Sequence, residues 1–245
     1  MIQMETSVAE IEHLKKSFGS NNVLNDISLK IEKGENLVVF GKSGSGKSVL
    51  IKCLIGLIEP DDGKVVLLGK NISDLKNEEL NLLRKKVGFL FQSAALYDSM
   101  TVRENLEFPL RDLKSKPKQE IEQLVMEALI NVGLEDAIDK MPSELSGGMR
   151  KRVGLARSLI LKPEIILYDE PTTGLDPITS KEISRLILDV QKKYNTASII
   201  ITHDVDCARI TSNRMIIINE GTCVAEGTFK ELSESKDEWV RSFFE

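Results

Sequence analysis

The sequence predicts an α/β fold in which short buried strands of a parallel sheet alternate with helices. Three observations support this class. A glycine-rich loop lies between an apolar run at residues 37–40 and a helix-like segment at 49–57. Two further apolar runs, 165–169 and 198–202, each end at polar side chains. Open α/β sheets bind ligands at the carboxyl ends of their parallel strands, so we expect the functional site there.

The glycine-rich loop has the form G-x-x-x-x-G-K-S and lies between a predicted strand and a predicted helix. Its glycines allow successive backbone N–H groups to face one centre, which forms a nest for an anion at a helix N-terminus. Lys47 can then reach the β- and γ-phosphates, and the Ser48 hydroxyl suits Mg²⁺. The sequence therefore predicts a nucleoside triphosphate site that contains Gly41, Lys42, Ser43, Gly44, Ser45, Gly46, Lys47, Ser48 and Val49.

Two acidic residues, Asp169 and Glu170, follow the second apolar run. A carboxylate at a strand end beside the phosphate loop is what Mg²⁺ coordination needs, so Asp169 is a predicted metal ligand. The adjacent Glu170 is expected near the attacking water, as a general base or a water-positioning group. His203 follows the third apolar run and is expected to contact the γ-phosphate. His13 lacks such a context and is interpreted as structural.

A second anion-binding pattern, Leu145-Ser-Gly-Gly-Met149, opens a basic, helix-forming segment at residues 149–161. The Ser146 hydroxyl and the N–H groups of a helix N-terminus can hold an anion. Taken alone, the pattern is equally compatible with an ordinary helix cap. Asp176 and Pro177 predict another helix start, with Asp176 as the N-cap and Pro177 in the first position.

The order of these motifs resembles that of the ATP-binding-cassette (ABC) ATPases over nearly the whole chain. The resemblance assigns the Walker A loop to 41–48, the Q-loop to Gln92, the signature to 145–149, Walker B to 165–169 with Glu170 as catalytic glutamate, the D-loop to 174–176 and the switch histidine to His203. It implies a P-loop NTPase with a RecA-like core, an antiparallel β layer and an inserted helical lobe.

The resemblance also implies roles for individual residues. The catalytic set is Glu170, His203, Lys47 and Gln92, and the Mg²⁺ ligands are Ser48, Gln92 and Asp169. ATP is the implied nucleotide. Phe18 lies where the family stacks an aromatic ring, usually Tyr, on adenine. Met149 departs from the commonest signature, which has Gln at this position.

In this family the signature serine contacts the nucleotide of a second, head-to-tail copy. The resemblance therefore implies a homodimer in which Ser146, Gly147 and Gly148 complete the partner's ATP site, with Asp176 in the D-loop. The ATPases also bind their membrane subunits through the segment after the Q-loop, here residues 93–110. Leu96, Tyr97 and Met100 look exposed in this segment.

The layout is interpreted as a single ABC ATPase domain over residues 1–245, with a core at about 1–92 and 160–226, a helical lobe at about 93–159 and a tail at about 227–245. Alternating apolar and polar residues within 8–40 predict an antiparallel sheet layer that ends at a turn, 33–34. Further strands are predicted at 65–68, 86–91, 215–218 and 222–225. Helical periodicity is expected at 121–132 and in the tail from 231, which is expected to cover its own core.

Longer stretches of sequence, at 91–100, 105–110, 141–149, 176–180 and 239–243, resemble the ATPases of MCE-type, Mla-like lipid transporters. This resemblance implies the movement of phospholipids or other hydrophobic molecules across a bacterial envelope. It also implies two permease subunits, an MCE-domain lipid-binding protein and a peripheral position at the cytoplasmic face of the inner membrane.

Composition limits the other classes of function. The chain has 33 basic and 38 acidic residues and a net charge of −5, which argues against a nucleic-acid partner. Cys53, Cys207 and Cys223 lack C-x-x-C spacing and are interpreted as reduced thiols. No apolar run approaches the roughly 18 residues needed to span a bilayer. Two alternatives stay open: the ATPase of an amino-acid importer or a lipoprotein-releasing ABC system, and a soluble ABC ATPase that acts on nucleic acid or ribosomes.

Overall fold

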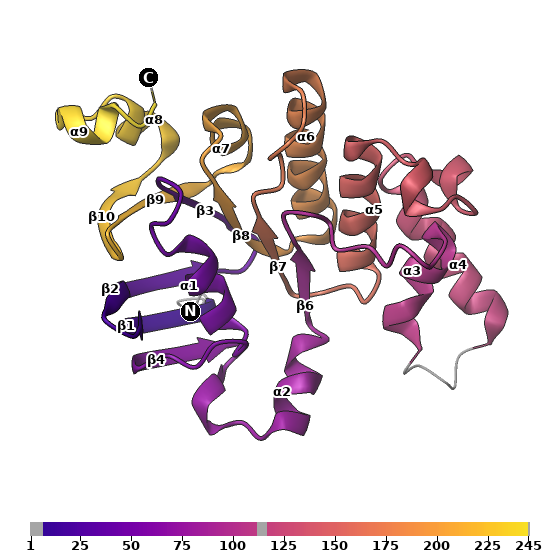
Figure 1. Cartoon of the computed structure of the whole chain (residues 1–245), viewed down its shortest axis with the longest axis horizontal. Coiled ribbons are helices and arrows are strands. Elements are labelled where there is room, and N and C mark those ends of the chain that lie inside the picture. Colours follow the sequence, from indigo (N-terminus) through magenta and orange to yellow (C-terminus); the bar gives the residue numbers. More distant parts are fainter. Residues whose placement is uncertain (1–6, 112–116, 245) are drawn as a thin grey trace, which may run out of the picture.

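The smaller of two β-sheets is antiparallel. The computed structural model describes residues 7–111 and 117–244, and within them this sheet has the strand order β2-β1-β4-β5. Its strands are β1 (Ser7–Phe18), β2 (Asn21–Glu32), β4 (Asp62–Leu67) and β5 (Lys70–Asn71). The predicted antiparallel layer is confirmed, and the sheet lies at the lower left of Figure 1.

The larger sheet has the order β10-β9-β3-β8-β7-β6 and forms the centre of the molecule. Its strands are β3 (Asn36–Phe40), β6 (Val87–Leu90), β7 (Ile165–Asp169), β8 (Ala197–Thr202), β9 (Arg214–Asn219) and β10 (Thr222–Gly227). Five of them pair in parallel, and β10 runs antiparallel to β9. Because β3, β7 and β8 are apolar along their length, both faces of the sheet need a cover.

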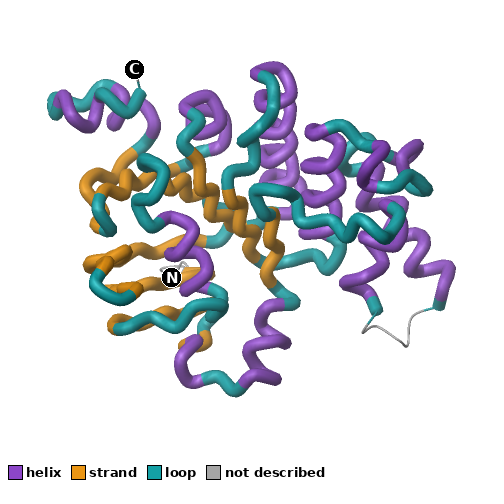
Figure 2. The backbone as a smooth tube through the Cα atoms, in the orientation of Figure 1, coloured by secondary structure: helices purple, strands orange, loops and turns teal. Residues whose placement is uncertain are grey.

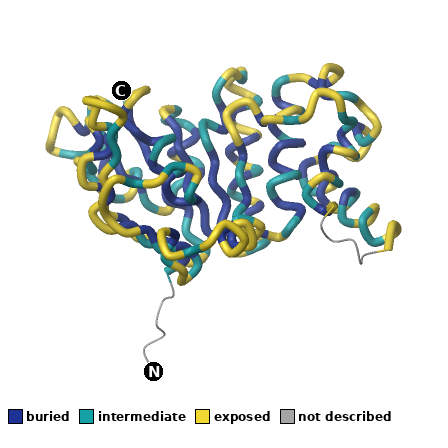
Figure 3. Tube along the Cα trace, turned by 60° about the horizontal axis from the view of Figure 1, so that its bottom comes forward, coloured by how far each residue is buried: buried dark blue, intermediate teal, exposed yellow. Residues whose placement is uncertain are grey.

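Alternate residues of the large sheet face two different hydrophobic cores, as the two-residue period of a strand requires. Leu37 and Val39 of β3 join one core, which also takes the smaller sheet and α1 (Lys47–Leu54). Val38 and Phe40 join the other core, which the remaining larger helices cover. Figure 3 shows the buried residues along the middle of the molecule and exposed residues on the outer loops.

Helices cover the second face of the large sheet (Figures 1 and 2). These are α5 (Gly147–Leu159), α6 (Pro177–Tyr194) and α7 (Val205–Thr211), and α3 (Val102–Glu107) and α4 (Lys118–Ile130) lie beyond α5. Another helix, α2 (Asn77–Arg84), packs against the first core. Between β6 and β7 the described residues form only helices, turns and loops, which agrees with the expected helical insertion.

The tail contains two short helices, α8 (Phe229–Ser233) and α9 (Glu238–Arg241), where the sequence suggested one helix-like segment from 231. The interruption arises because Asp237 caps a new helix through the Trp239 N–H. The ring of Phe244 stacks on Phe40, with centroids 5.8 Å apart, and Phe243 approaches Phe40 edge-on at 6.2 Å. The tail therefore packs on the core, as expected, against Phe40, the residue that precedes the phosphate loop.

Two predicted helix boundaries were shifted. The first helix spans Lys47–Leu54 where the sequence suggested 49–57, because it begins directly after Gly46 and the left-handed Gly56 follows its end. Helix α5 likewise begins at Gly147, two residues before the predicted start, because the Ser146 side chain caps it. Both shifts place the motif glycines at the helix N-terminus.

Candidate nucleotide site

The register of the large sheet brings the predicted site residues together. Strand β8 lies between β3 and β7, with Thr202 opposite Phe40 and Ile201 opposite Asp169. The next residues along these strands are His203, Gly41 and Glu170. The carboxyl ends of three neighbouring parallel strands therefore deliver the phosphate loop, an acidic pair and a histidine to one edge of the sheet.

The phosphate loop leads into the N-terminus of α1 without a side-chain cap. Gly46 is the N-cap residue, and its φ of 98° is a conformation that glycine adopts at low cost. A Cβ atom here would lie 2.6 Å from the Val23 carbonyl oxygen, so a side chain would not fit. The N–H groups of the first turn of α1 are therefore arranged for an anionic ligand.

The amine of Lys47 lies inside this loop. Its Nζ donates to the carbonyl oxygens of Gly41 at 2.7 Å and Lys42 at 2.9 Å. Burial lowers the pKa of Lys47, and the carboxylates of Glu170 and Asp169 oppose that effect. The buried Ser45 hydroxyl has no hydrogen-bond partner within the described chain. A buried cation and an unsatisfied hydroxyl on a curled backbone fit a polyphosphate.

Two oxygen donors suited to magnesium face each other at the start of α1. The Ser48 hydroxyl donates to Asp169 Oδ1 at 3.0 Å, and burial raises the pKa of Asp169 while this hydrogen bond lowers it. No group of three or more His, Cys, Asp or Glu side chains within the described ranges could hold a metal ion. A pair of hard oxygens nevertheless fits Mg²⁺, which takes one or two protein ligands beside substrate phosphates and water.

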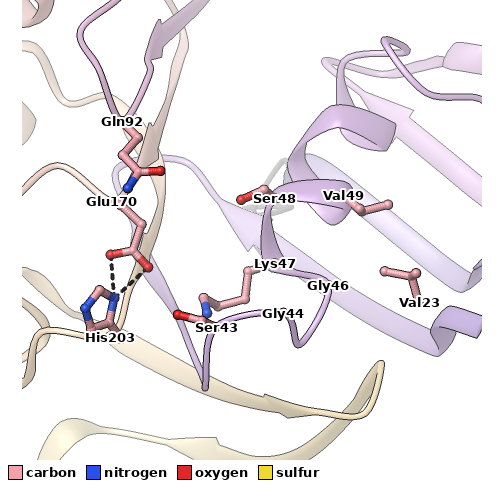
Figure 4. A pocket seen from close by; sticks show the side chains of 10 residues that line it. All are labelled: Val23, Ser43, Gly44, Gly46, Lys47, Ser48, Val49, Gln92, Glu170 and His203. Carbon is pink, nitrogen blue, oxygen red and sulfur yellow. Dashed lines mark hydrogen bonds and ion pairs between the residues drawn. The ribbon is translucent and has the colours of Figure 1, made fainter. Parts of the chain in front are cut away.

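Glu170 and His203 form a pair opposite the phosphate loop (Figure 4). Histidine Nδ1 lies 2.9 Å from both carboxylate oxygens, and the Thr173 hydroxyl donates to Oε2 of Glu170 at 3.1 Å. Glu170 has a φ of +50°, which a non-glycine residue seldom adopts. Its backbone N–H donates to the Ile201 carbonyl at 2.9 Å. Strained backbone of this kind clusters at functional sites.

These groups surround a cavity of about 270 Å³. Its lining consists of Val23, Ser43, Gly44, Gly46, Lys47, Ser48, Val49, Gln92, Glu170 and His203. Gln92 follows the end of β6, as the strand predicted at 86–91 required, and its exposed side chain lines the cavity. Val23 was not predicted from the sequence; it is the third residue of β2 and approaches the loop from the smaller sheet.

The signature and D-loop residues do not line this cavity. Exposed Ser146 is the N-cap of α5 and accepts from the Met149 N–H at 3.2 Å, and Gly147 lines a separate cavity of about 320 Å³ beside Gln92. Asp176 caps α6, accepting from the N–H groups of Ile178 and Thr179 at 3.0 Å, with Pro177 first in the helix as predicted.

Phe18, predicted to stack on adenine, and His13, interpreted as structural, both lie at the surface. Phe18, at the end of β1, keeps 50% of its surface exposed, and the Lys16 ammonium lies 5.5 Å from its ring centroid. His13 is also exposed, and its Nδ1 lies 2.8 Å from Asp26 Oδ1, outside the nucleotide cavity.

The expected exposure of Leu96, Tyr97 and Met100 was only partly right. Tyr97 is exposed, but Leu96 packs partly against the core and Met100 is half-buried. The cause is the buried Asn105, whose side chain accepts from the Tyr97 N–H at 2.8 Å and donates to the carbonyls of Tyr97 and Met100 at 3.1 Å. The loop therefore folds around Asn105.

Sequence reasoning also missed Lys151, in the second turn of α5. Its side chain is buried, and Nζ donates to the backbone carbonyls of Gln92 at 2.5 Å and Glu170 at 3.0 Å. Burial lowers the pKa of Lys151 to about 8, an effect that the carboxylates of Glu170 and Asp169 oppose. Its neighbours Arg150 and Arg152 gave no signal that the intervening lysine points inward.

Comparison with known proteins decides the family. Residues 24–173 match the family model described as ABC transporter. The chain belongs to the ABC transporter family. The probable ribonucleotide transport ATP-binding protein Mkl of Mycobacterium tuberculosis is 42% identical over 234 residues, which cover 96% of this chain and 65% of Mkl. This chain thus spans less than two thirds of the length of that relative.

Two further relatives match over most of this chain. The intermembrane phospholipid transport system ATP-binding protein MlaF of Haemophilus influenzae is 37% identical, with coverage of 98% of this chain and 91% of MlaF. The methionine import ATP-binding protein MetN 1 of Listeria monocytogenes is 40% identical, with coverage of 91% and 67%.

Solved structures confirm the predicted fold. The ATP-binding cassette MJ0796, solved as a dimer in a post-hydrolysis state with ADP and Pi, aligns with a TM-score of 0.82 at 31% identity, covering 90% of this chain and 98% of that one. CbiO1 of Clostridium perfringens aligns with a TM-score of 0.87 at 31% identity, covering 97% and 94%. No helix in residues 7–111 and 117–244 is long and apolar enough to cross a bilayer.

Proposed function

We propose that this chain is the ATP-hydrolysing subunit of a membrane ABC transporter that moves phospholipids or other hydrophobic molecules across a bacterial envelope. The observation that carries the proposal is the meeting of Lys47, Glu170 and His203 around one cavity at the ends of three parallel strands. A buried cation, a carboxylate and a histidine around a phosphate nest are the parts that phosphoryl transfer to water requires.

In this proposal the loop amides and Lys47 bind the β- and γ-phosphates of ATP. Ser48, Asp169 and Gln92 would hold Mg²⁺, which would neutralise charge that develops on the transferred phosphoryl group. Glu170 accepts a proton from, or orients, the attacking water. Its hydrogen bonds with His203 and Thr173 fix the direction of the carboxylate. His203, on the rim of the cavity, contacts the γ-phosphate, and the exposed Phe18 ring stacks on adenine.

A second copy of the chain completes the site. The proposal is supported by the place of Ser146 and Gly147, which lie outside the cavity that holds the other groups. Hydrolysis in this arrangement removes the γ-phosphate charge that joins the signature of one copy to the phosphate loop of the other. The two copies can then separate, so that ATP binding and hydrolysis alternate a closed and an open dimer.

The permease partner is assigned to the face around residues 93–110. Tyr97 and Phe108 pack with ring centroids 4.7 Å apart and stay 42% and 36% exposed. The Arg157 guanidinium lies 5.9 Å from the Tyr97 ring centroid and Arg111 lies 4.7 Å from that of Phe108. An exposed aromatic pair flanked by arginines is typical of an interface centre. Together with an MCE-domain protein, the permease would place the chain at the cytoplasmic face of the inner membrane.

The similarity to MlaF supports a phospholipid substrate, since that relative is named for intermembrane phospholipid transport. The similarity to MetN 1 keeps an amino-acid importer as the second candidate, because the nucleotide site serves any substrate. Only the membrane partner distinguishes these two transporters.

Reconstitution tests the proposal. The permease is first identified by its co-purification with the chain. The two proteins are then co-expressed, and their complex is placed in vesicles that contain a fluorescent phospholipid. We expect ATP-dependent movement of the phospholipid and none with the Glu170→Gln complex. Bound phospholipid identified by mass spectrometry supports the lipid substrate, whereas ATP-dependent uptake of an amino acid without lipid movement contradicts it.

A further inference from the structure

Helix α5 contains a buried lysine that the proposed cycle leaves without a role. Lys151 is only 5% exposed, and the cavity around the phosphate loop does not include it. Its ammonium group donates to two backbone carbonyls, those of Gln92 at 2.5 Å and Glu170 at 3.0 Å. A buried charge is retained only where its hydrogen bonds are satisfied, so these two bonds define the environment of this side chain.

The two carbonyls belong to the two segments that must act together in a transporter. Gln92 directly precedes residues 93–110, the segment assigned to the permease, and Glu170 carries the carboxylate assigned to the attacking water. They follow neighbouring parallel strands, β6 and β7. The Lys151 ammonium group therefore links the backbone just before residues 93–110, here called the docking segment, to the backbone of Glu170.

The bond to Glu170 acts on a peptide whose geometry is unusual. Glu170 has a φ of +50°, its N–H is held by the Ile201 carbonyl at 2.9 Å, and its carbonyl is held by Lys151 at 3.0 Å. The residue is thus fixed from β8 on one side and from α5 on the other. Because the direction of a side chain follows its own backbone, the Lys151 bond influences where the carboxylate points.

Helix α5 holds the same segment at a second point. Arg157 donates to the Ala94 carbonyl at 2.9 Å. Between these two cations, Gly154 allows close approach, since a Cβ there would lie 2.8 Å from Leu90 Cδ1 and 3.0 Å from Ala94 Cβ. Arg152, on the same helix, donates instead to the Val132 carbonyl at 3.1 Å, which lies outside residues 93–110, so Arg152 is a matched comparison for Lys151.

We propose that Lys151 is a positioning residue that couples the docking segment, which follows Gln92, to the carboxylate of Glu170. A displacement of the Gln92 carbonyl, as permease movement would cause, changes the hydrogen bonding of Lys151 and thereby the backbone of Glu170. This inference rests on the proposed function, because it needs Glu170 to act on water and residues 93–110 to contact the permease.

The experiment compares three variants of the full chain in its permease complex: Lys151→Met, which keeps the length without the donors, Lys151→Arg, which keeps a cation, and the control Arg152→Met. We expect Lys151→Met to lower kcat for ATP by about 10- to 100-fold with KM and ATP affinity within about twofold, as for a mispositioned reacting group. Lys151→Arg should restore at least part of kcat. Arg152→Met should lower kcat by no more than about twofold, since the Lys151 bonds to Gln92 and Glu170 stay intact.

A double-mutant cycle separates positioning from general destabilisation. In the Glu170→Gln background, single-turnover hydrolysis should show no further loss on adding Lys151→Met, because the carboxylate that Lys151 positions is already absent. An additive loss, or an equal loss in Arg152→Met, would overturn the inference. If Lys151→Met does not fold, Lys151→Arg decides: a kcat within about tenfold of the wild-type value supports the requirement for a donor at this position, and a larger loss refutes it. A wild-type complex that hydrolyses no ATP overturns the proposed function instead.

Discussion

The N-termini of helices α1 and α5 both offer backbone N–H groups to an anion, but their surroundings differ. The N-cap of α1 is Gly46, which supplies no side chain, and Lys47, Asp169 and Glu170 lie around that terminus. The N-cap of α5 is Ser146, whose hydroxyl accepts from the Met149 N–H. The cavity that Gly147 lines contains Arg150 and Lys151, but neither Lys47 nor Glu170 of the nucleotide cavity.

The difference suits the two helix starts to different roles in our proposal. The first N–H groups of α1 have no capping side chain, so a bound phosphate would supply their hydrogen-bond acceptor. The terminus of α5 is stable without a ligand because Ser146 caps it. Its remaining exposed N–H groups can therefore bind a nucleotide that is held by another copy of the chain. We therefore infer that α1 defines the site and α5 completes that of a second copy.

The largest expected effect concerns the carboxylate at the α1 site. Glu170→Gln keeps the shape of the side chain but removes the proton acceptor, so we expect kcat for ATP to fall by about 10²- to 10⁴-fold, the usual contribution of general-base catalysis. Affinity for ATP should stay within about twofold, since the Glu170 carboxylate contacts His203 and Thr173 and not the loop amides. Steady-state hydrolysis and equilibrium binding of a fluorescent ATP analogue measure the two quantities.

Glu164→Gln is the control for this variant. Glu164 lies just before the opposite end of β7 and pairs with Lys86 at 2.9 Å on the surface, so its loss should leave hydrolysis unchanged. Glu170→Gln with ATP should also form a dimer that light scattering detects. A wild-type rate in Glu170→Gln would remove this residue from the mechanism.

A mixing experiment tests whether α1 and α5 of different copies form one site. Lys47→Ala should weaken ATP binding by roughly 10- to 100-fold, the effect of losing hydrogen bonds to a charged group. Ser146→Glu should leave binding to the isolated chain intact but oppose the phosphates of the partner's ATP. In a mixed dimer one of the two sites keeps both native residues. We expect the mixture to hydrolyse ATP faster than either variant alone, and an unchanged rate would mean that each chain holds a complete site.

The sequence predicted the α1 site well because its residues follow three apolar runs that are long enough to be strands. In a parallel sheet, neighbouring strands end at the same edge. The pairing of β3, β8 and β7 therefore places Gly41, Glu170 and His203 close together. The fold class and family followed from the same motifs and are confirmed. Their roles in catalysis stay predictions.

Other features depended on packing that no local pattern reveals. Lys151 lies in a basic run between Arg150 and Arg152, and charge alone predicts that such a segment is solvated. Its burial arises because Gly154 brings the loop after β6 against α5, where two carbonyls can accept from the ammonium group. Leu96 was expected to be exposed for a similar reason, because the sequence did not show that Asn105 organises the surrounding loop.

The smallest expected effect concerns Phe18, the exposed ring at the end of β1 that we propose stacks on adenine without reading a particular base. Phe18→Ala should weaken ATP binding by about 1 kcal/mol, or roughly fivefold in Kd, the lower end of the cost of losing one stacked base. Because every base has a π-face, GTP should lose affinity by a similar factor. Phe18→Tyr should bind as wild type, and Leu82→Ala, an exposed side chain outside the cavity, serves as control. Titration with both nucleotides checks the prediction, and equal affinities in Phe18→Ala and wild type would place adenine away from β1.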